Sequence, residues 1–199
     1  MDGAFLDAFA AGPWALPLLF LLVLGDAFLV VVPGEAAVTA YGALAVSTGS
    51  PPLAAVIAVA AAAAACGDVA CYTIGRRVGI DRWRWMRTRR VQAAIGWARD
   101  RLHRSTATAL FTARFIPFAR LAVNLTAGAT RVPAPRYVAM VAVAATVWAA
   151  YQALLGALVA SVLPGGTVTA VIVSIAVGLI TGFAVDAALA ARRRRAGRS

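Results

Sequence analysis

Four long apolar runs limit what this chain can fold into. They cover residues 14–32, 53–75, 136–161 and 167–191, and a helix needs roughly 20 apolar residues to cross a bilayer. The chain is 62% hydrophobic, whereas a soluble domain is about half apolar. Backbone groups inside lipid must be satisfied within helices or closed barrels, and the alternating pattern of barrel strands is absent. The sequence therefore predicts an all-α polytopic membrane protein in which residues 1–199 form a single membrane domain.

The distribution of arginine indicates how these segments are oriented. The net charge is +11 and all 19 basic residues are arginine, of which ten lie in 76–104 and four form the run 192–195. Because basic loops are retained on the cytoplasmic side of a membrane, both stretches and the C-terminus are predicted to be cytoplasmic. Segment 76–104, in which tryptophans are interspersed with arginines, is predicted to lie on anionic lipid as an amphipathic segment. This orientation accounts for the charge, so no nucleic-acid partner is expected.

Residues 105–130 begin and end on the same side of the membrane in this orientation. Segment 167–191 must run from outside to inside and 136–161 from inside to outside, so 105–130 both starts and ends inside. About 26 residues are too few for two crossings, which need roughly 40. The sequence therefore predicts a re-entrant hairpin, with Pro117 breaking the helix near its tip.

Residues 14–48 are predicted to form a second re-entrant hairpin, which enters from outside. Segment 53–75 ends inside at the arginines, so it begins outside, and a Pro-Gly pair interrupts the preceding apolar run. Each half is then a hairpin followed by a transmembrane helix, in opposite orientations. The prediction is an inverted repeat with an additional C-terminal transmembrane helix, an arrangement that places a transport site near the bilayer midplane. The alternative is that 14–32 spans by itself and 36–48 is the re-entrant piece.

Two arginines, Arg114 and Arg120, lie inside the apolar second hairpin with Pro117 between them. A charge at membrane depth costs at least a few kcal/mol, so it is usually retained for function. A helix break at Pro117 lets both guanidinium groups converge on one anion, and guanidinium binds phosphate through paired hydrogen bonds. We therefore expect Arg114 and Arg120 to bind a phosphate head group. The alternative is that both snorkel to the interface and form internal ion pairs.

Two carboxylates occupy the first hairpin. Asp26 and Glu35 lie nine residues apart, and Glu35 directly follows the helix-breaking Pro33 and Gly34. Intramembrane carboxylates bind protons or pair with arginine, so both are predicted to couple transport to protons or to gate it. The alternatives are a helix cap at the outer interface for Glu35 and a structural ion pair for Asp26.

Asp68 lies eight residues before Arg76, which places it inside the hydrocarbon or at its inner edge. A proton-coupling role and a structural contact with a hairpin both fit this position. Tyr72, one helical turn later, is predicted to donate a hydrogen bond to Asp68. Gly67 and Gly75 are predicted to allow close approach of neighbouring helices.

The remaining reactive residues form no catalytic or metal-binding pattern. Cys66 and Cys71 lie about 140° apart around one helix, so neither a metal site nor a disulfide is expected and both are predicted to be small core residues. His103 is the only histidine and lies in the arginine-rich loop. A lipid phosphatase would need more histidines, a carboxylate cluster or a nucleophile motif. We therefore predict no cofactor, no metal and no enzymatic activity.

Several motifs together resemble the DedA family, also called the VTT or SNARE-associated membrane protein family. They occur in family order over residues 25–156: Asp26 with PGE at 33–35, AYGALAVSTG at 40–49, GDVACYTIGRRVG at 67–79, RFIPFAR at 114–120, AG at 127–128, Trp148, and LLG at 154–156. The resemblance implies a bacterial inner-membrane protein with two opposed re-entrant hairpins. It implies that the family's essential acidic pair corresponds to Asp26 and Glu35, and its essential arginine pair to Arg114 and Arg120. The first acidic position is often glutamate, and here it is the shorter Asp26.

The resemblance also implies a function in lipid transport. Members are implicated in returning undecaprenyl phosphate across the membrane, in proton-motive-force homeostasis and in resistance to cationic drugs, and related eukaryotic proteins scramble phospholipids. The leading hypothesis is a lipid-phosphate flippase for an anionic isoprenoid lipid or phospholipid. Undecaprenyl phosphate is the expected substrate and protons the expected coupling ion, and an electropositive cavity is expected to open laterally to the membrane lipids. The alternatives are a proton-coupled antiporter for small cations or drugs, and a phospholipid scramblase. The lipid, the direction, the energy coupling and whether the chain forms a homo-oligomer stay open.

Overall fold

The secondary-structure elements in the described part of the chain are helices. The computed structural model describes residues 8, 10–29, 34–78, 88–89, 92–93, 95–98, 106, 110, 119–162, 169, 172–173 and 176. In these residues the regular structure is helical, without a strand, which confirms the predicted all-α class. The labelled helices are α2 (Ala15–Asp26), α3 (Gly34–Ser47), α4 (Leu53–Val78), α7 (Ala119–Ala129) and α8 (Ala134–Val162).

Some of the predicted features lie outside the described residues. These are Pro33, Arg114 and Pro117, most of the predicted segments 76–104 and 167–191, and the first limb of the predicted hairpin 105–130.

Within the described part of the chain, α4 and α8 are the two helices long and apolar enough to cross a membrane. α4 has 26 residues and α8 has 29, and an 18-residue stretch of each has a mean hydropathy of 2.1 and 1.8, respectively. At about 1.5 Å per residue, both exceed the roughly 30 Å of a bilayer core. One side of α8 exposes large apolar side chains over residues 143–158, namely Val143, Val147, Leu154 and Leu158. Such a continuous apolar surface fits contact with lipid.

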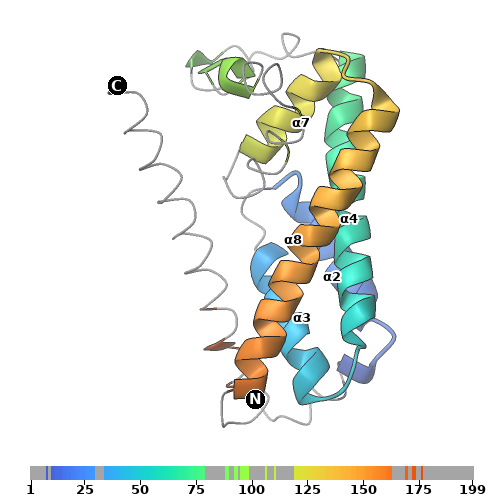
Figure 1. The fold of residues 1–199 in the computed structure, drawn as a ribbon, viewed down its shortest axis with the longest axis vertical. Helices are drawn as coiled ribbons and strands as arrows, with labels where there is room; N and C mark the ends of the chain where they lie inside the picture. The colour runs from blue at the N-terminus through green and yellow to red at the C-terminus, as the bar shows by residue number, and fades with distance from the viewer. Residues whose placement is uncertain are drawn as a thin grey trace.

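The first apolar run folds into two short helices instead of one long one. α2 has 12 residues and ends at Asp26, and α3 has 14 residues and begins at Gly34. At about 1.5 Å per residue, neither reaches across the hydrocarbon core of a bilayer. Figure 1 shows α2 rising into the bundle and α3 returning toward the end at which α2 began. Their facing ends, Asp26 and Gly34, therefore lie inside the bundle.

The helix α7 occupies the opposite half of the molecule. It begins inside the bundle at Ala119 and runs to the end at which α4 also ends (Figure 1). Its buried side includes two polar residues, Asn124 and Thr126. This helix therefore directs polar groups into the protein.

The helices α3 and α8 cross at two glycines, Gly42 and Gly156. A Cβ atom added to Gly42 would overlap the main-chain oxygen of Ala153, and one added to Gly156 would overlap the main-chain oxygen of Thr39. Each glycine therefore lies against the carbonyl group three residues before the other glycine. Small residues permit such close crossings in membranes, where Cα–H···O contacts form between the two backbones.

The helices α7 and α4 cross in the same way. A Cβ atom added to Gly75 would overlap the main-chain oxygen of Leu125, and one added to Gly128 would overlap that of Tyr72. Again each glycine faces the carbonyl group three residues before its partner. The predicted close approach at Gly75 is confirmed.

The contact between α2 and α4 also depends on a small residue. A Cβ atom added to Gly67 would overlap the Cβ of Ala27, which confirms the predicted close approach there. The buried thiol of Cys71 donates a hydrogen bond of 3.7 Å to the main-chain oxygen of Ala27. The prediction that both cysteines are core residues is wrong for Cys66, which is exposed. In an apolar helix the lipid-facing and core-facing sides have similar composition, so residue type does not distinguish them.

Candidate functional site

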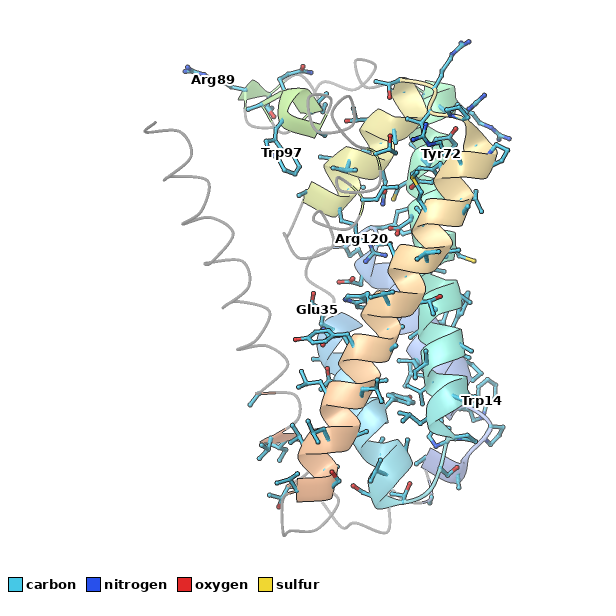
Figure 2. All side chains as sticks on the ribbon, in the orientation of Figure 1. Trp14, Glu35, Tyr72, Arg89, Trp97 and Arg120 are labelled. Atoms are coloured by element: carbon cyan, nitrogen blue, oxygen red, sulfur yellow. The ribbon has the colours of Figure 1, made fainter. Side chains whose placement is uncertain are left out.

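The centre of the candidate site is Arg120, the second residue of α7. Its Nε donates a hydrogen bond of 2.7 Å to Oδ1 of Asp68, and its Nη1 donates one of 3.0 Å to Oδ2 of Asp26. Its Nη2 donates a third, of 3.3 Å, to the main-chain oxygen of Ala64. The side chain is 14% exposed, and Figure 2 shows it in the interior between the helices. One guanidinium group therefore connects α2, α4 and α7.

Asp68 lies in the most enclosed part of this site. It projects from α4 and its side chain is 3% exposed. Its Oδ1 accepts a second hydrogen bond, of 2.7 Å, from Nδ2 of Asn124. The hydroxyl of Tyr137 lies 2.9 Å from Oδ1 of Asn124 and 3.0 Å from the main-chain oxygen of Asp68. Because the Tyr137 hydroxyl has one proton, it can donate a hydrogen bond to only one of these two oxygens at a time.

Asp26 occupies the more open side. It is the last residue of α2, and its side chain is 20% exposed. The main-chain N–H of Gly34, at the start of α3, donates a hydrogen bond to its carboxylate. A Cβ atom added to Gly34 would lie 2.8 Å from the Cβ of Asp26, so only glycine leaves room for this contact. The junction of α2 and α3 is thereby shaped around one carboxylate.

Glu35 lies in the first turn of α3 and is partly buried. A carboxylate in this position is favoured by the partial positive charge at the helix N-terminus. The hydroxyl of Thr39, one turn later, donates to the main-chain oxygen of Glu35 at 2.9 Å. Figure 2 shows Glu35 near the level of the helix junction, on the α3 side of Arg120. The carboxylates whose ion pairs with Arg120 are described are Asp26 and Asp68.

The predicted hydrogen bond from Tyr72 to Asp68 is wrong. The Tyr72 hydroxyl donates to the main-chain oxygen of Val132 at 2.6 Å, and it accepts a bond of the same length from Nη1 of Arg76. Its ring stacks on Tyr137, with centroids 4.2 Å apart. This stacking holds the Tyr72 hydroxyl at the end of α4, away from the carboxylate.

The sequence interpretation missed Asn124 and Tyr137. Asn124 follows Arg120 by four residues, so the two share one face of α7, and this spacing was the available signal. Tyr137 comes from α8, and only the tertiary packing brings it to Asp68. Of the predicted site residues, the structure joins Asp26, Asp68 and Arg120 directly and places Gly34 against Asp26.

The described cavity is apolar. It is a groove of about 550 Å³ between α4 and α8. Its lining residues are Ala54, Ile57, Ala58, Ala61, Ala62, Ala65, Ala142 and Thr146. It therefore differs from the electropositive cavity that the transport hypothesis predicts. The described residues also contain no cluster of three or more side chains suited to a metal ion.

Comparison with known proteins identifies the family. Residues 32–158 match the family model of the VTT domain. Neither the curated proteins nor the solved structures gave a significant match. The matched region contains α3, α4, α7 and most of α8, and with them Asp68, Arg120 and Asn124. Together with the two apolar helices, this match shows that the chain is a membrane protein and belongs to the VTT-domain family, which is the DedA family.

Proposed function

We propose that this protein moves lipid phosphates across the bacterial inner membrane, with undecaprenyl phosphate as the favoured substrate. The observation that carries the proposal is Arg120, a guanidinium group held inside a bundle of apolar helices by carboxylates from two other helices. A buried ion pair is rarely worth more than well-packed apolar residues. An ionic centre at this depth is therefore better explained by binding of a charged substrate than by stability.

The chemistry of the site suits a phosphate. Guanidinium forms paired, charge-assisted hydrogen bonds with phosphate oxygens and stays charged at any working pH. Asp26 and Asp68 now accept two of the N–H groups through which Arg120 could bind a phosphate. Binding of the lipid head group thus requires a carboxylate to leave, and protonation of that carboxylate would couple transport to protons. Arg114 would supply the second guanidinium, and Glu35 the second exchangeable carboxylate.

The glycine crossings support the proposed inverted repeat. In the repeat, α3 corresponds to α7 and α4 corresponds to α8, so the α3–α8 contact should resemble the α7–α4 contact. Both crossings use one glycine from each helix, and in both each glycine meets the carbonyl group three residues before the other. Gly42 and Gly128 are then equivalent, as are Gly75 and Gly156. The shortness of α2 and α3 favours a re-entrant hairpin over a spanning helix in residues 14–48.

The remaining parts of the proposal come from the sequence. The protein is a transporter without enzymatic activity, its partners are its lipid substrate and the surrounding membrane lipids, and its C-terminus is cytoplasmic. A proton-coupled antiporter for cations is the second candidate, because the described site contains two carboxylates and one guanidinium. A phospholipid scramblase would use the same head-group site without coupling to protons.

Transport in sealed liposomes tests the proposal. Purified protein is reconstituted, and movement of polyprenyl phosphate is followed with and without a pH gradient. We expect Arg120→Lys and Arg120→Ala to abolish transport, because neither variant retains the paired donors. The matched control is Arg89→Ala, which removes an exposed arginine outside this site.

The outcomes separate the candidates. Transport by wild type that is lost in the Arg120 variants and kept in Arg89→Ala supports the proposal. Proton-coupled cation exchange without any movement of lipid phosphate would favour the antiporter. Movement of neutral and anionic phospholipids alike, independent of the pH gradient, would favour the scramblase.

A further inference from the structure

The two carboxylates that bind Arg120 are held in different ways. We propose that Asp68 is a permanent partner that positions Arg120, and that Asp26 is the partner which the phosphate displaces. This inference rests on the proposed function and assigns distinct tasks to two residues of its site. It also adds Asn124 and Tyr137 to the site as residues that act through Asp68.

Asp68 is held on several sides. It projects from the middle of a helix of 26 residues, and its side chain is 3% exposed. Its Oδ1 accepts from both Arg120 and Asn124 at 2.7 Å. The Asn124 amide must direct its Nδ2 toward the carboxylate, and its Oδ1 then faces the hydroxyl of Tyr137 at 2.9 Å. Rotating Asp68 away would leave buried donors without partners, which costs about 1–3 kcal/mol for each group.

Asp26 is held more loosely. It is the last residue of a short helix, and its side chain is 20% exposed. Its bonds go to Nη1 of Arg120 and to the main-chain N–H of Gly34. When Asp26 moves away, Arg120 keeps its bonds to Asp68 and to the Ala64 carbonyl group.

The geometry of the guanidinium group shows where the phosphate would enter. Nε and Nη2 form one edge of the group, and both donate to α4, through Asp68 and Ala64. A guanidinium has five N–H groups, and the three described bonds leave one N–H on each terminal nitrogen. Departure of Asp26 frees the second N–H of Nη1 and removes the negative charge that would repel a phosphate, so Nη1 and Nη2 can bind two oxygens of one phosphate. The edge that faces α4 stays occupied throughout.

Identical substitutions at the two aspartates test this division. Asp68→Asn keeps an oxygen that can accept from both Arg120 and Asn124, whereas Asp68→Ala removes it. Loss of the Asp68 charge strengthens the attraction of Arg120 for Asp26 and for phosphate alike, so the exchange between them changes little. Asp26→Asn instead removes the charged competitor for the phosphate.

The readouts are KM and turnover for polyprenyl phosphate in liposomes. We expect Asp68→Asn to keep both values within about threefold of wild type and Asp68→Ala to lose turnover by at least about tenfold, the equivalent of one charge-assisted hydrogen bond. We expect Asp26→Asn to lower KM and turnover together, because phosphate binds without a competitor and nothing displaces it afterwards. Loss of transport in Asp68→Asn equal to that in Asp68→Ala would overturn the proposal, since it would make the charge or proton of Asp68 the essential property.

A second measurement does not depend on the substrate. Double-mutant cycles between Arg120→Ala and either Asp68→Ala or Asp26→Ala are read from unfolding of the purified protein in mixed micelles. A larger coupling for Asp68 than for Asp26 supports the assignment even if no lipid phosphate moves, an outcome that would reject only the proposed function. Equal couplings, or a larger one for Asp26, would overturn the assignment.

Discussion

The close contact between Gly156 and the Thr39 carbonyl group can be tested by adding a single methyl group, in the variant Gly156→Ala. A methyl group at Gly156 would overlap the Thr39 oxygen, and the opposing atoms belong to backbone, which cannot rotate away. Carbon and carbonyl oxygen ordinarily approach no closer than about 3.3 Å, so Gly156→Ala forces α3 and α8 apart. Such overpacking costs about 1–3 kcal/mol. We expect Gly156→Ala to lower the free energy of unfolding by this amount.

The assay is reversible unfolding of the purified protein by SDS in mixed micelles, followed by tryptophan fluorescence. Gly96→Ala is the matched control, because Gly96 is helical and a Cβ atom there meets nothing within 4 Å. This control should gain about 0.5–1 kcal/mol, as alanine does over glycine in a helix. Gly75→Ala tests the equivalent crossing of α7 and α4 and should lose about as much as Gly156→Ala. If Gly156→Ala proves as stable as Gly96→Ala, the close crossing is not present in the protein.

Three further predictions use the same unfolding assay. Arg131→Gly should stabilise the protein by about 1 kcal/mol, because Arg131 follows the end of α7 with a φ of 56° and its N–H donates to the main-chain oxygen of Gly128. A destabilised variant would show that the arginine side chain has a role there. Gln152→Leu should be neutral or stabilising by about 1–3 kcal/mol, because in the described structure the buried Oε1 of Gln152 has no hydrogen-bond partner. A large decrease in the free energy of unfolding would indicate that Oε1 has a partner in the folded protein. Asn124→Ala should cost about 1–3 kcal/mol through the lost bonds to Asp68 and Tyr137, and an unchanged stability would contradict the described network.

The sequence predicted the helices where length and apolarity decide the outcome. The runs at 53–75 and 136–161 correspond to α4 and α8, which are within a few residues of the same bounds. The run at 14–32 was long enough to span, yet α2 ends at Asp26. A carboxylate bound to Arg120 and to the N–H of Gly34 is stable there only because other segments supply those partners. Tertiary contacts, which composition does not encode, thus decide where this helix ends.

The sequence identified individual residues of the candidate site, but it did not show which of them form pairs. Asp26, Asp68 and Arg120 attract attention singly, because charge inside an apolar segment is costly. Their pairing depends on the packing of three helices. Tyr72 was assigned to Asp68 from helical spacing alone, and its stacking on Tyr137 directs its hydroxyl to Val132 instead.

The pairing of α3 with α8 has a consequence for the synthesis of the protein. α3 buries nine of its 14 residues, and its crossing partner Gly156 is translated more than 100 residues after Gly42. At about 5–20 residues per second, the ribosome adds α8 on the order of 10 s later. During that interval the small-residue face of α3 has no native partner, whereas α4 and α7 can already associate. Insertion factors or neighbouring lipids must cover that face meanwhile. Variants at Gly42 and Gly156 should therefore lower the yield of inserted protein more than they lower transport by the protein that is inserted.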